Sequence, residues 1–124
     1  MPEKSRQDLK ARAFEFAAAI FGRYKRLAAG SPAHAHMAQQ LFEAASSIGA
    51  MLEEAEVGMS RRDMAAKQSI ALRESRESHY WLRLLSMDSE LTADLVPLVD
   101  ESRQFVAMLT TSVKKLRNPP GSAS

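Results

Sequence analysis

The sequence predicts an all-α protein, an antiparallel up-down-up-down four-helix bundle. Four stretches of about 20 to 25 residues carry apolar side chains at spacings of three and four, the period of a helix with one buried face. Five glycines and five prolines lie mostly between these stretches and in the C-terminal tail. The connections are short, so consecutive helices are expected to pack as antiparallel neighbours. With 124 residues, we expect one domain over residues 1–117 and a flexible tail over 118–124.

The first helix is predicted to follow a capping pattern at Ser5 and Asp8 and to run to about Ala29. Its core line consists of Leu9, Ala13, Phe16, Ile20, Tyr24 and Leu27. Phe14 and Phe21, seven residues apart, form a second apolar line beside it. A helix with two apolar lines either packs centrally in its own bundle or offers one line to another subunit.

The second helix is predicted from Gly30-Ser31-Pro32, which supplies a C-cap, an N-cap and a first helical residue in succession. It is expected to extend to about Val57. Its core line consists of Met37, Leu41, Ala44, Ile48, Leu52 and Ala55. Gly49 lies in the middle of this helix, where glycine costs about 1 kcal/mol relative to alanine. We therefore expect a neighbouring helix to approach closely at Gly49.

The third helix is predicted from Ser60 to Leu85, with no glycine or proline after its first residue. Ser60 and Asp63 have the spacing of an N-cap and a returning carboxylate. The helix closes on the densest apolar cluster of the chain, formed by Tyr80, Trp81, Leu82, Leu84 and Leu85. Such an end is expected to need partners on more than one side.

The fourth helix is predicted over roughly Thr92 to Leu116. Its core line consists of Leu95, Val99, Ser102, Phe105 or Val106, Leu109, Val113 and Leu116. Pro97 is tolerated only in the first turn of a helix. Either the helix proper begins near Val96, or a short turn precedes a kink at Pro97.

Segments of the second and third helices resemble a known family. They are Ser46-Ser47-Ile48-Gly49-Ala50, Leu52-Glu53-Glu54-Ala55, Ser60-Arg61-Arg62-Asp63, Ala71-Leu72-Arg73-Glu74-Ser75-Arg76-Glu77 and Tyr80-Trp81-Leu82-Arg83-Leu84-Leu85. Together they resemble the 23S rRNA intervening-sequence protein family, small bacterial four-helix-bundle proteins similar in fold to the accessory variability protein of diversity-generating retroelements. The similarity extends from about Asp8 to Leu116, and the first and fourth helices match mainly in pattern. Two positions depart from the family pattern: Met51 replaces a usual Asn, and Met64 replaces a usual aromatic residue.

The resemblance implies a homo-oligomer, with a pentameric ring as the known form. It implies no established biochemical activity for most members. Nucleic-acid association, documented for the retroelement relative, is what it suggests for this chain.

The residues that carry enzyme chemistry form no recognisable constellation. The absence of cysteine excludes disulfides, a thiolate nucleophile and cysteine-bound zinc. No Glu is followed three residues later by His, which is the motif of di-metal bundle sites. His34 and His36 are expected at the surface and His79 partly buried. We therefore predict a protein that is not an enzyme and binds no metal or cofactor.

The N-terminal sequence is charged and lacks the apolar stretch of a secretory signal. No apolar run approaches the roughly 18 residues of a membrane span. We expect a cytoplasmic protein without a membrane partner.

The net charge of +2 hides an uneven distribution. An up-down bundle gathers the start of the first helix, the end of the second, the start of the third and the end of the fourth. That end is expected to hold ten basic residues, Lys4, Arg6, Lys10, Arg12, Arg61, Arg62, Lys67, Lys114, Lys115 and Arg117, against six acids, Glu3, Asp8, Glu53, Glu54, Glu56 and Asp63. Repeated on one rim of a ring, such an end would attract phosphate groups in a salt-sensitive and sequence-tolerant manner. The alternative is a solvated surface on which the cations pair with the six acids.

Two hypotheses follow. The first is a non-enzymatic homo-oligomeric bundle that binds nucleic acid, RNA or DNA, with structured RNA as the favoured ligand, through its basic end. The candidate contact residues are Lys10, Arg12, Arg61, Arg62, Lys114, Lys115 and Arg117, and the candidate subunit contacts are Phe14, Phe21, Arg76 and Trp81. For Arg76 the alternative is pairing with glutamates of its own helix. For Trp81 the alternatives are burial in the core and a role as a base-stacking platform. The second hypothesis is a scaffold that docks a partner protein and binds no nucleic acid.

Overall fold

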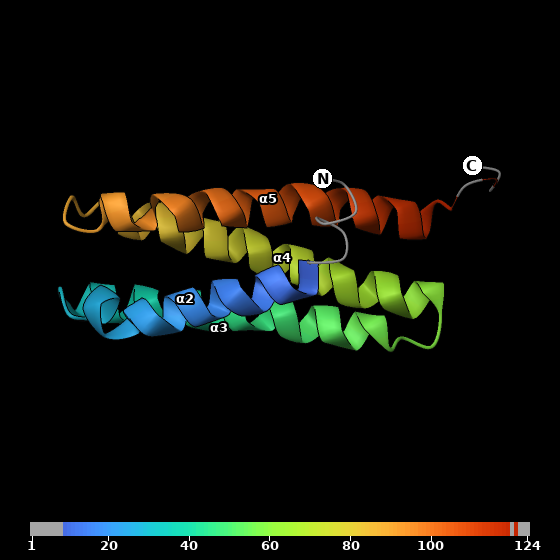
Figure 1. The fold of residues 1–124 in the computed structure, drawn as a ribbon, viewed down its shortest axis with the longest axis horizontal. Helices are drawn as coiled ribbons and strands as arrows, with labels where there is room; N and C mark the ends of the chain where they lie inside the picture. Colours follow the sequence, from blue (N-terminus) through green and yellow to red (C-terminus); the bar gives the residue numbers. More distant parts are fainter. Residues whose placement is uncertain (1–8, 120, 122–124) are drawn as a thin grey trace.

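The computed structural model describes residues 9–119 and 121, which form a bundle of four helices and contain no strand (Figure 1). The predicted all-α bundle is confirmed. The helices are α2 (Leu9–Ala28), α3 (Pro32–Glu56), α4 (Arg61–Leu85) and α5 (Thr92–Arg117). The predicted capping residues Ser5 and Asp8, and residues 120 and 122–124 of the predicted tail, lie outside the described residues.

The helices follow one another up and down, with α2 beside α3, α3 beside α4 and α4 beside α5. Side chains of α2 also reach across to α5: Arg23 and Arg26 both bind Asp94. Figure 1 shows that α2 begins short of the end at which α3 turns into α4. This offset matters for the candidate site, because the described start of α2 does not extend to that end.

The predicted caps of α3 and α4 are confirmed. The Ser31 hydroxyl oxygen accepts a hydrogen bond from the backbone N–H of His34, and Pro32 is the first residue of α3. The Ser60 hydroxyl oxygen accepts from the N–H of Asp63, whose carboxylate accepts from the N–H of Met59. These bonds satisfy donors that a helix start otherwise leaves without partners.

The predicted core lines supply most of the buried core. The larger side chains that are fully buried are Ile20, Leu27, Leu41, Ile48, Leu82, Leu85, Leu95, Phe105 and Leu109. Phe16 packs edge-on against Phe105, with ring centroids 5.3 Å apart. Leu98 is also buried, although the predicted line passed through its neighbour Val99.

The apolar cluster at the end of α4 is only partly buried. Leu82 and Leu85 are in the core, whereas Tyr80 and Leu84 are exposed. The expectation of partners on more than one side is confirmed for α4, which packs against both α3 and α5. These neighbours leave Tyr80 and Leu84 exposed. Both side chains lie on the outward face of α4.

Gly49 lies where α3 approaches α2. A Cβ added there would lie 3.6 Å from the Cβ of Ala13 and 3.8 Å from the backbone N of Phe14. The predicted close approach at Gly49 is confirmed, at the distance of ordinary van der Waals contact.

Pro97 lies inside α5, which already begins at Thr92. The alternative that the helix proper begins near Val96 is therefore wrong. Pro97 and Ala93 are both exposed, so water can reach the Ala93 carbonyl that loses its usual N–H donor.

Candidate nucleic-acid interface

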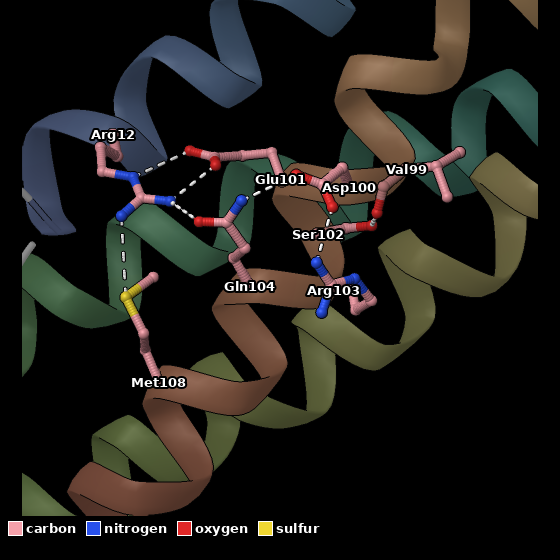
Figure 2. Close-up of polar contacts among 8 residues, drawn as sticks. All are labelled: Arg12, Val99, Asp100, Glu101, Ser102, Arg103, Gln104 and Met108. Carbon is pink, nitrogen blue, oxygen red and sulfur yellow. Dashed lines mark hydrogen bonds and ion pairs between the residues drawn. The ribbon is translucent and has the colours of Figure 1, made fainter.

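Arg12 lies away from the predicted basic end and binds the middle of α5 (Figure 2). Its Nε and Nη2 donate to the carboxylate of Glu101 at 3.0 and 2.7 Å, and Nη2 also donates to Gln104 Oε1 at 2.9 Å. The guanidinium carbon lies 5.7 Å from the centre of the Phe105 ring. The side chains of Arg12 and Glu101 are only 23% and 25% exposed. Arg12 therefore joins α2 to α5, and its predicted placement at the basic end is wrong because α2 begins short of that end.

Other charges counted at this end are paired on the α3 side. Lys10 binds Glu56 at 2.9 Å, and its pKa is raised by the hydrogen bond and the charge of that carboxylate. Lys67 lies 3.9 Å from Glu54. Glu54 and Glu56 thus have cations of their own, and Asp63 caps a helix. The predicted contributors Glu3, Lys4, Arg6 and Asp8 lie outside the described residues.

The remaining cations gather between the start of α4 and the end of α5. Arg61, Arg62 and Arg117 line a hollow of about 530 Å³. Its other lining residues are Ala65, Ala66, Leu116 and Pro119. Lys114 and Lys115 are exposed in the last turn of α5. We call Arg61, Arg62 and Arg117, which line the hollow, together with Lys114 and Lys115 of the last turn of α5, the basic hollow.

The cations of the basic hollow have no acidic partner in the part of the chain that the structure describes. Arg117 donates to the hydroxyl oxygen of Ser69 at 2.8 Å. Within residues 9–119 and 121, none of the five forms an ion pair with a carboxylate. Three of the seven predicted contact residues, Arg61, Arg62 and Arg117, therefore line one hollow that is open to an external anion. Lys114 and Lys115 are exposed in the same turn of α5 as Arg117, whereas Lys10 and Arg12 have internal partners.

The helix dipole explains only part of this surface. Lys114, Lys115 and Arg117 lie in the last turn of α5, where cations stabilise the exposed carbonyl end. Arg61 and Arg62 open α4, where the dipole favours acids instead. Helix stability therefore explains the positions of the three α5 cations, but it does not explain the presence of Arg61 and Arg62 at the start of α4.

The candidate subunit contacts lie on two other parts of the surface. Phe14 and Phe21 are each 70% exposed on α2, so they are not part of the core of this bundle. The Phe21 ring lies 5.9 Å from that of Phe42 on α3. Trp81 is half-buried, and its ring lies 5.9 Å from that of His36 across the α3–α4 contact.

The arginines in the middle of α4 differ in their pairing. Arg73 lies 3.5 Å from the carboxylate of Glu74. Arg76 and Arg83 are exposed, and no carboxylate of the described chain pairs with either. Pairing within the helix thus accounts for Arg73 alone.

The histidines have structural partners. His79 Nδ1 lies 2.9 Å from the hydroxyl oxygen of Ser102, which itself donates to the Val99 carbonyl. Burial, and then the positive charge of Arg83, lowers the pKa of His79. His34 is half-buried and lies 2.9 Å from Asp88, so its predicted surface position is wrong, whereas His36 is exposed.

The described residues also bear on metal binding and membrane insertion. No three His, Cys, Asp or Glu side chains converge within residues 9–119 and 121 in a way that could hold a metal ion. None of the described helices combines the length and apolar character of a membrane span.

The sequence interpretation missed a second basic groove, between the end of α4 and the start of α5. Arg83, Asp100 and Arg103 line it, with a volume of about 370 Å³. Grouping charges by the ends of the bundle concealed these residues. The regular spacing of arginines along the third predicted helix was the signal that could have revealed them.

Comparison with known proteins identifies close structural relatives. Residues 6–111 match the 23S rRNA-intervening sequence protein family. A crystal structure of a protein of unknown function from the S23 ribosomal protein family of Bacteroides thetaiotaomicron VPI-5482 is 33% identical to this chain, with a TM-score of 0.75. That match covers 85% of this chain and 97% of the other. No curated protein matches the chain.

Proposed function

The chain belongs to the 23S rRNA-intervening sequence protein family, and on that premise we propose that it is a non-enzymatic, homo-oligomeric bundle that binds structured RNA through the basic hollow. The family name concerns a segment of ribosomal RNA genes, and the fold brings Arg61, Arg62 and Arg117 around one open hollow, with Lys114 and Lys115 exposed in the same turn as Arg117. Phosphate groups are the ligands that such a surface attracts without reading sequence.

One observation carries the proposal. Arg61 and Arg62 are the first two residues of α4, are exposed, and have no carboxylate partner among the described residues. Positive charges at the N-terminus of a helix are repelled by the positive end of the helix dipole, which costs about 0.3–1 kcal/mol each. An anion bound by the two arginines would offset this electrostatic cost.

Self-association is supported by Phe14 and Phe21 on α2. Both rings are 70% exposed and lie seven residues apart, which places them on one face. Exposed aromatic side chains of this kind are enriched at subunit contacts. The residues of the basic hollow belong to α4 and α5, so pairing through this part of α2 leaves them accessible.

The same aromatic pair favours a second candidate, a scaffold that docks a partner protein. In that case Phe14 and Phe21 contact the partner, and the purified protein is monomeric. RNA affinity separates the two candidates, because the scaffold needs no phosphate contacts.

The test is a charge reversal at the start of α4. A labelled RNA hairpin is titrated with the wild-type protein and with the Arg61→Glu, Arg62→Glu variant at low salt. We expect the double variant to lose at least tenfold in affinity, because two phosphate contacts are replaced by repulsion. Two controls are Arg61→Lys with Arg62→Lys, which keeps the charge, and Lys25→Glu on α2. Equal affinities of the wild type and the double Glu variant would reject the assignment.

A further inference from the structure

The outward face of α4 carries a regular line of basic residues. Its residues recur at alternating spacings of four and three, and side chains so spaced lie along one face of a helix. The line consists of Arg62, Ala66, Ser69, Arg73, Arg76, Tyr80 and Arg83, all exposed except the partly exposed Ser69. It contains four arginines and no acid, and it begins in the basic hollow.

A second line runs along α5 with the same spacing. It consists of Val96, Asp100, Arg103, Ala107, Thr110, Lys114 and Arg117, all exposed. The two lines lie side by side at both ends. Arg117 donates to Ser69 near one end, and Arg83 and Arg103 line the same groove near the other.

Asp100 is the single acid of the two lines, and both oxygens of its carboxylate accept hydrogen bonds from side chains of α5. Arg103 Nη2 donates to Oδ1 at 2.7 Å, and Gln104 Nε2 donates to Oδ2 at 2.7 Å (Figure 2). These bonds lower the pKa of Asp100 and hold it as a carboxylate. Glu74, the partner of Arg73, is only 15% exposed and does not belong to either line.

The positive charges of Arg83 and Arg103 act on His79 at the far end of this surface. After burial, the charge of Arg83 is the next cause that lowers its pKa, and Arg103 on α5 adds to it. The hydroxyl of Ser102 on α5 is the neutral group at its Nδ1. His79 therefore lies close enough to sense an anion bound at these arginines.

The length of the surface indicates its ligand. Arg62 and Arg83 are 21 residues apart, which at a rise of 1.5 Å per residue is about 32 Å. That length is of the order of one turn of a nucleic-acid duplex, which is about 34 Å in B-form DNA and somewhat shorter in A-form RNA. Tyr80 is the one exposed aromatic residue of the two lines, with the Arg83 guanidinium 5.9 Å from its ring centre. A single strand would require several such stacking platforms.

We propose that these two lines form the binding surface for about one turn of double-helical RNA that lies parallel to α4 and α5. The surface, here the arginine track, consists of Arg62, Arg73, Arg76, Arg83, Arg103, Lys114 and Arg117. Arg76, considered above as a subunit contact, instead contacts phosphate. The inference rests on the proposed function, since the track begins in the basic hollow and extends it along the bundle.

The test uses variants far from the basic hollow. The full-length protein and its Arg76→Glu, Arg83→Glu variant are titrated with an RNA hairpin whose stem is about one turn long, over a range of salt concentrations. We expect the variant to lose at least tenfold in affinity. We also expect the slope of log K against log salt to become shallower by about 2, since each duplex phosphate contact contributes about 0.9. The Arg76→Lys, Arg83→Lys variant, which keeps the charge, should bind like the wild type.

A second readout is the pKa of His79, followed by NMR in the wild-type protein. Saturating RNA should raise this pKa, because bound phosphate offsets the charges of Arg83 and Arg103.

The outcomes separate the two proposals. Unchanged affinity of the Arg76→Glu, Arg83→Glu variant, together with loss of binding by the Arg61→Glu, Arg62→Glu variant, would overturn the arginine track and leave the basic hollow. An unchanged His79 pKa at saturation would also overturn the track. No binding of any hairpin by the wild type at low salt would overturn both.

Discussion

At the scale of single residues, Arg12 shows how one side chain closes the bundle. Its planar fork binds both oxygens of Glu101 and the amide oxygen of Gln104, which lie one helical turn apart or less on α5. Gln104 in turn donates a hydrogen bond from Nε2 to the carboxylate of Asp100. The guanidinium of an arginine can bind the carboxylate through two nitrogens, whereas the ammonium group of a lysine cannot form this bidentate pair.

We expect Arg12→Met to destabilise the fold by about 1–3 kcal/mol, because it leaves the half-buried Glu101 without its partner. Urea unfolding measures the change. The double variant Arg12→Met, Glu101→Gln should recover part of the loss, because no unpaired charge remains. RNA affinity should not change in either variant, and a folded Arg12→Met protein with weakened binding would contradict the structural role.

Gly49 offers a stabilising substitution. An added Cβ meets Ala13 at 3.6 Å, which is ordinary contact, while alanine removes the helix penalty of glycine. We expect Gly49→Ala to raise the free energy of unfolding by up to about 1 kcal/mol. Gly22→Ala is the matched comparison, because a Cβ there meets nothing within 4 Å. Destabilisation by Gly49→Ala alone would mean that α2 and α3 approach more closely than described.

His79 predicts a pH dependence of stability. Its pKa lies below the ordinary 6.5, so the folded protein binds its proton less readily than the unfolded chain. The contribution to stability is therefore complete above pH 6.5 and decreases as the pH falls from 6.5 through the folded-state pKa. Urea midpoints at pH 7.5 and 5.5 should differ less for His79→Gln than for the wild type. An equal difference in the two proteins would refute the assignment.

At the scale of elements, α4 combines a conventional start with an unconventional charge. Ser60 and Asp63 cap it as such residues usually do, yet Arg61 and Arg62 oppose its dipole. The caps, the core lines and the Gly49 approach could be predicted because they depend on spacing along one chain segment. The path of α5 through Pro97 could not, because it depends on Pro97 and Ala93 both facing solvent.

The Arg61→Glu, Arg62→Glu variant should therefore be at least as stable as the wild type. Glutamate in the first turn of a helix is favoured by the dipole by about 0.3–1 kcal/mol per residue. Thermal unfolding by circular dichroism should show an equal or higher midpoint. A lower midpoint would mean that the two arginines stabilise the fold, and their exposure would then need no ligand to explain it.

At the scale of the whole molecule, the bundle carries two distinct surfaces: exposed phenylalanines on α2 and a line of cations on α4 and α5. The sequence located five of the proposed RNA contacts at the correct end. It misplaced Arg12, because the tally of charges by helix ends ignored where α2 begins. It also overlooked Arg83 and Arg103, which come together only when α4 and α5 pack side by side.

Replacing the two exposed phenylalanines tests the first surface. We expect Phe14→Ser, Phe21→Ser to reduce the mass measured by light scattering from that of an oligomer to the 13.7 kDa of one chain. Met59→Ser, at a 96% exposed position outside the helices, is the control and should leave the mass unchanged. An oligomer that persists in the double variant would exclude this face as the main subunit contact.

RNA binding through the basic hollow is best tested by the affinity for a structured RNA hairpin at low and at moderate salt, for the wild type and for the Arg61→Glu, Arg62→Glu variant. We expect micromolar or tighter binding by the wild type that weakens steeply with salt, and at least tenfold weaker binding by the variant. Absence of binding by the wild type at low salt would contradict RNA binding and would leave a bundle whose exposed phenylalanines dock another protein.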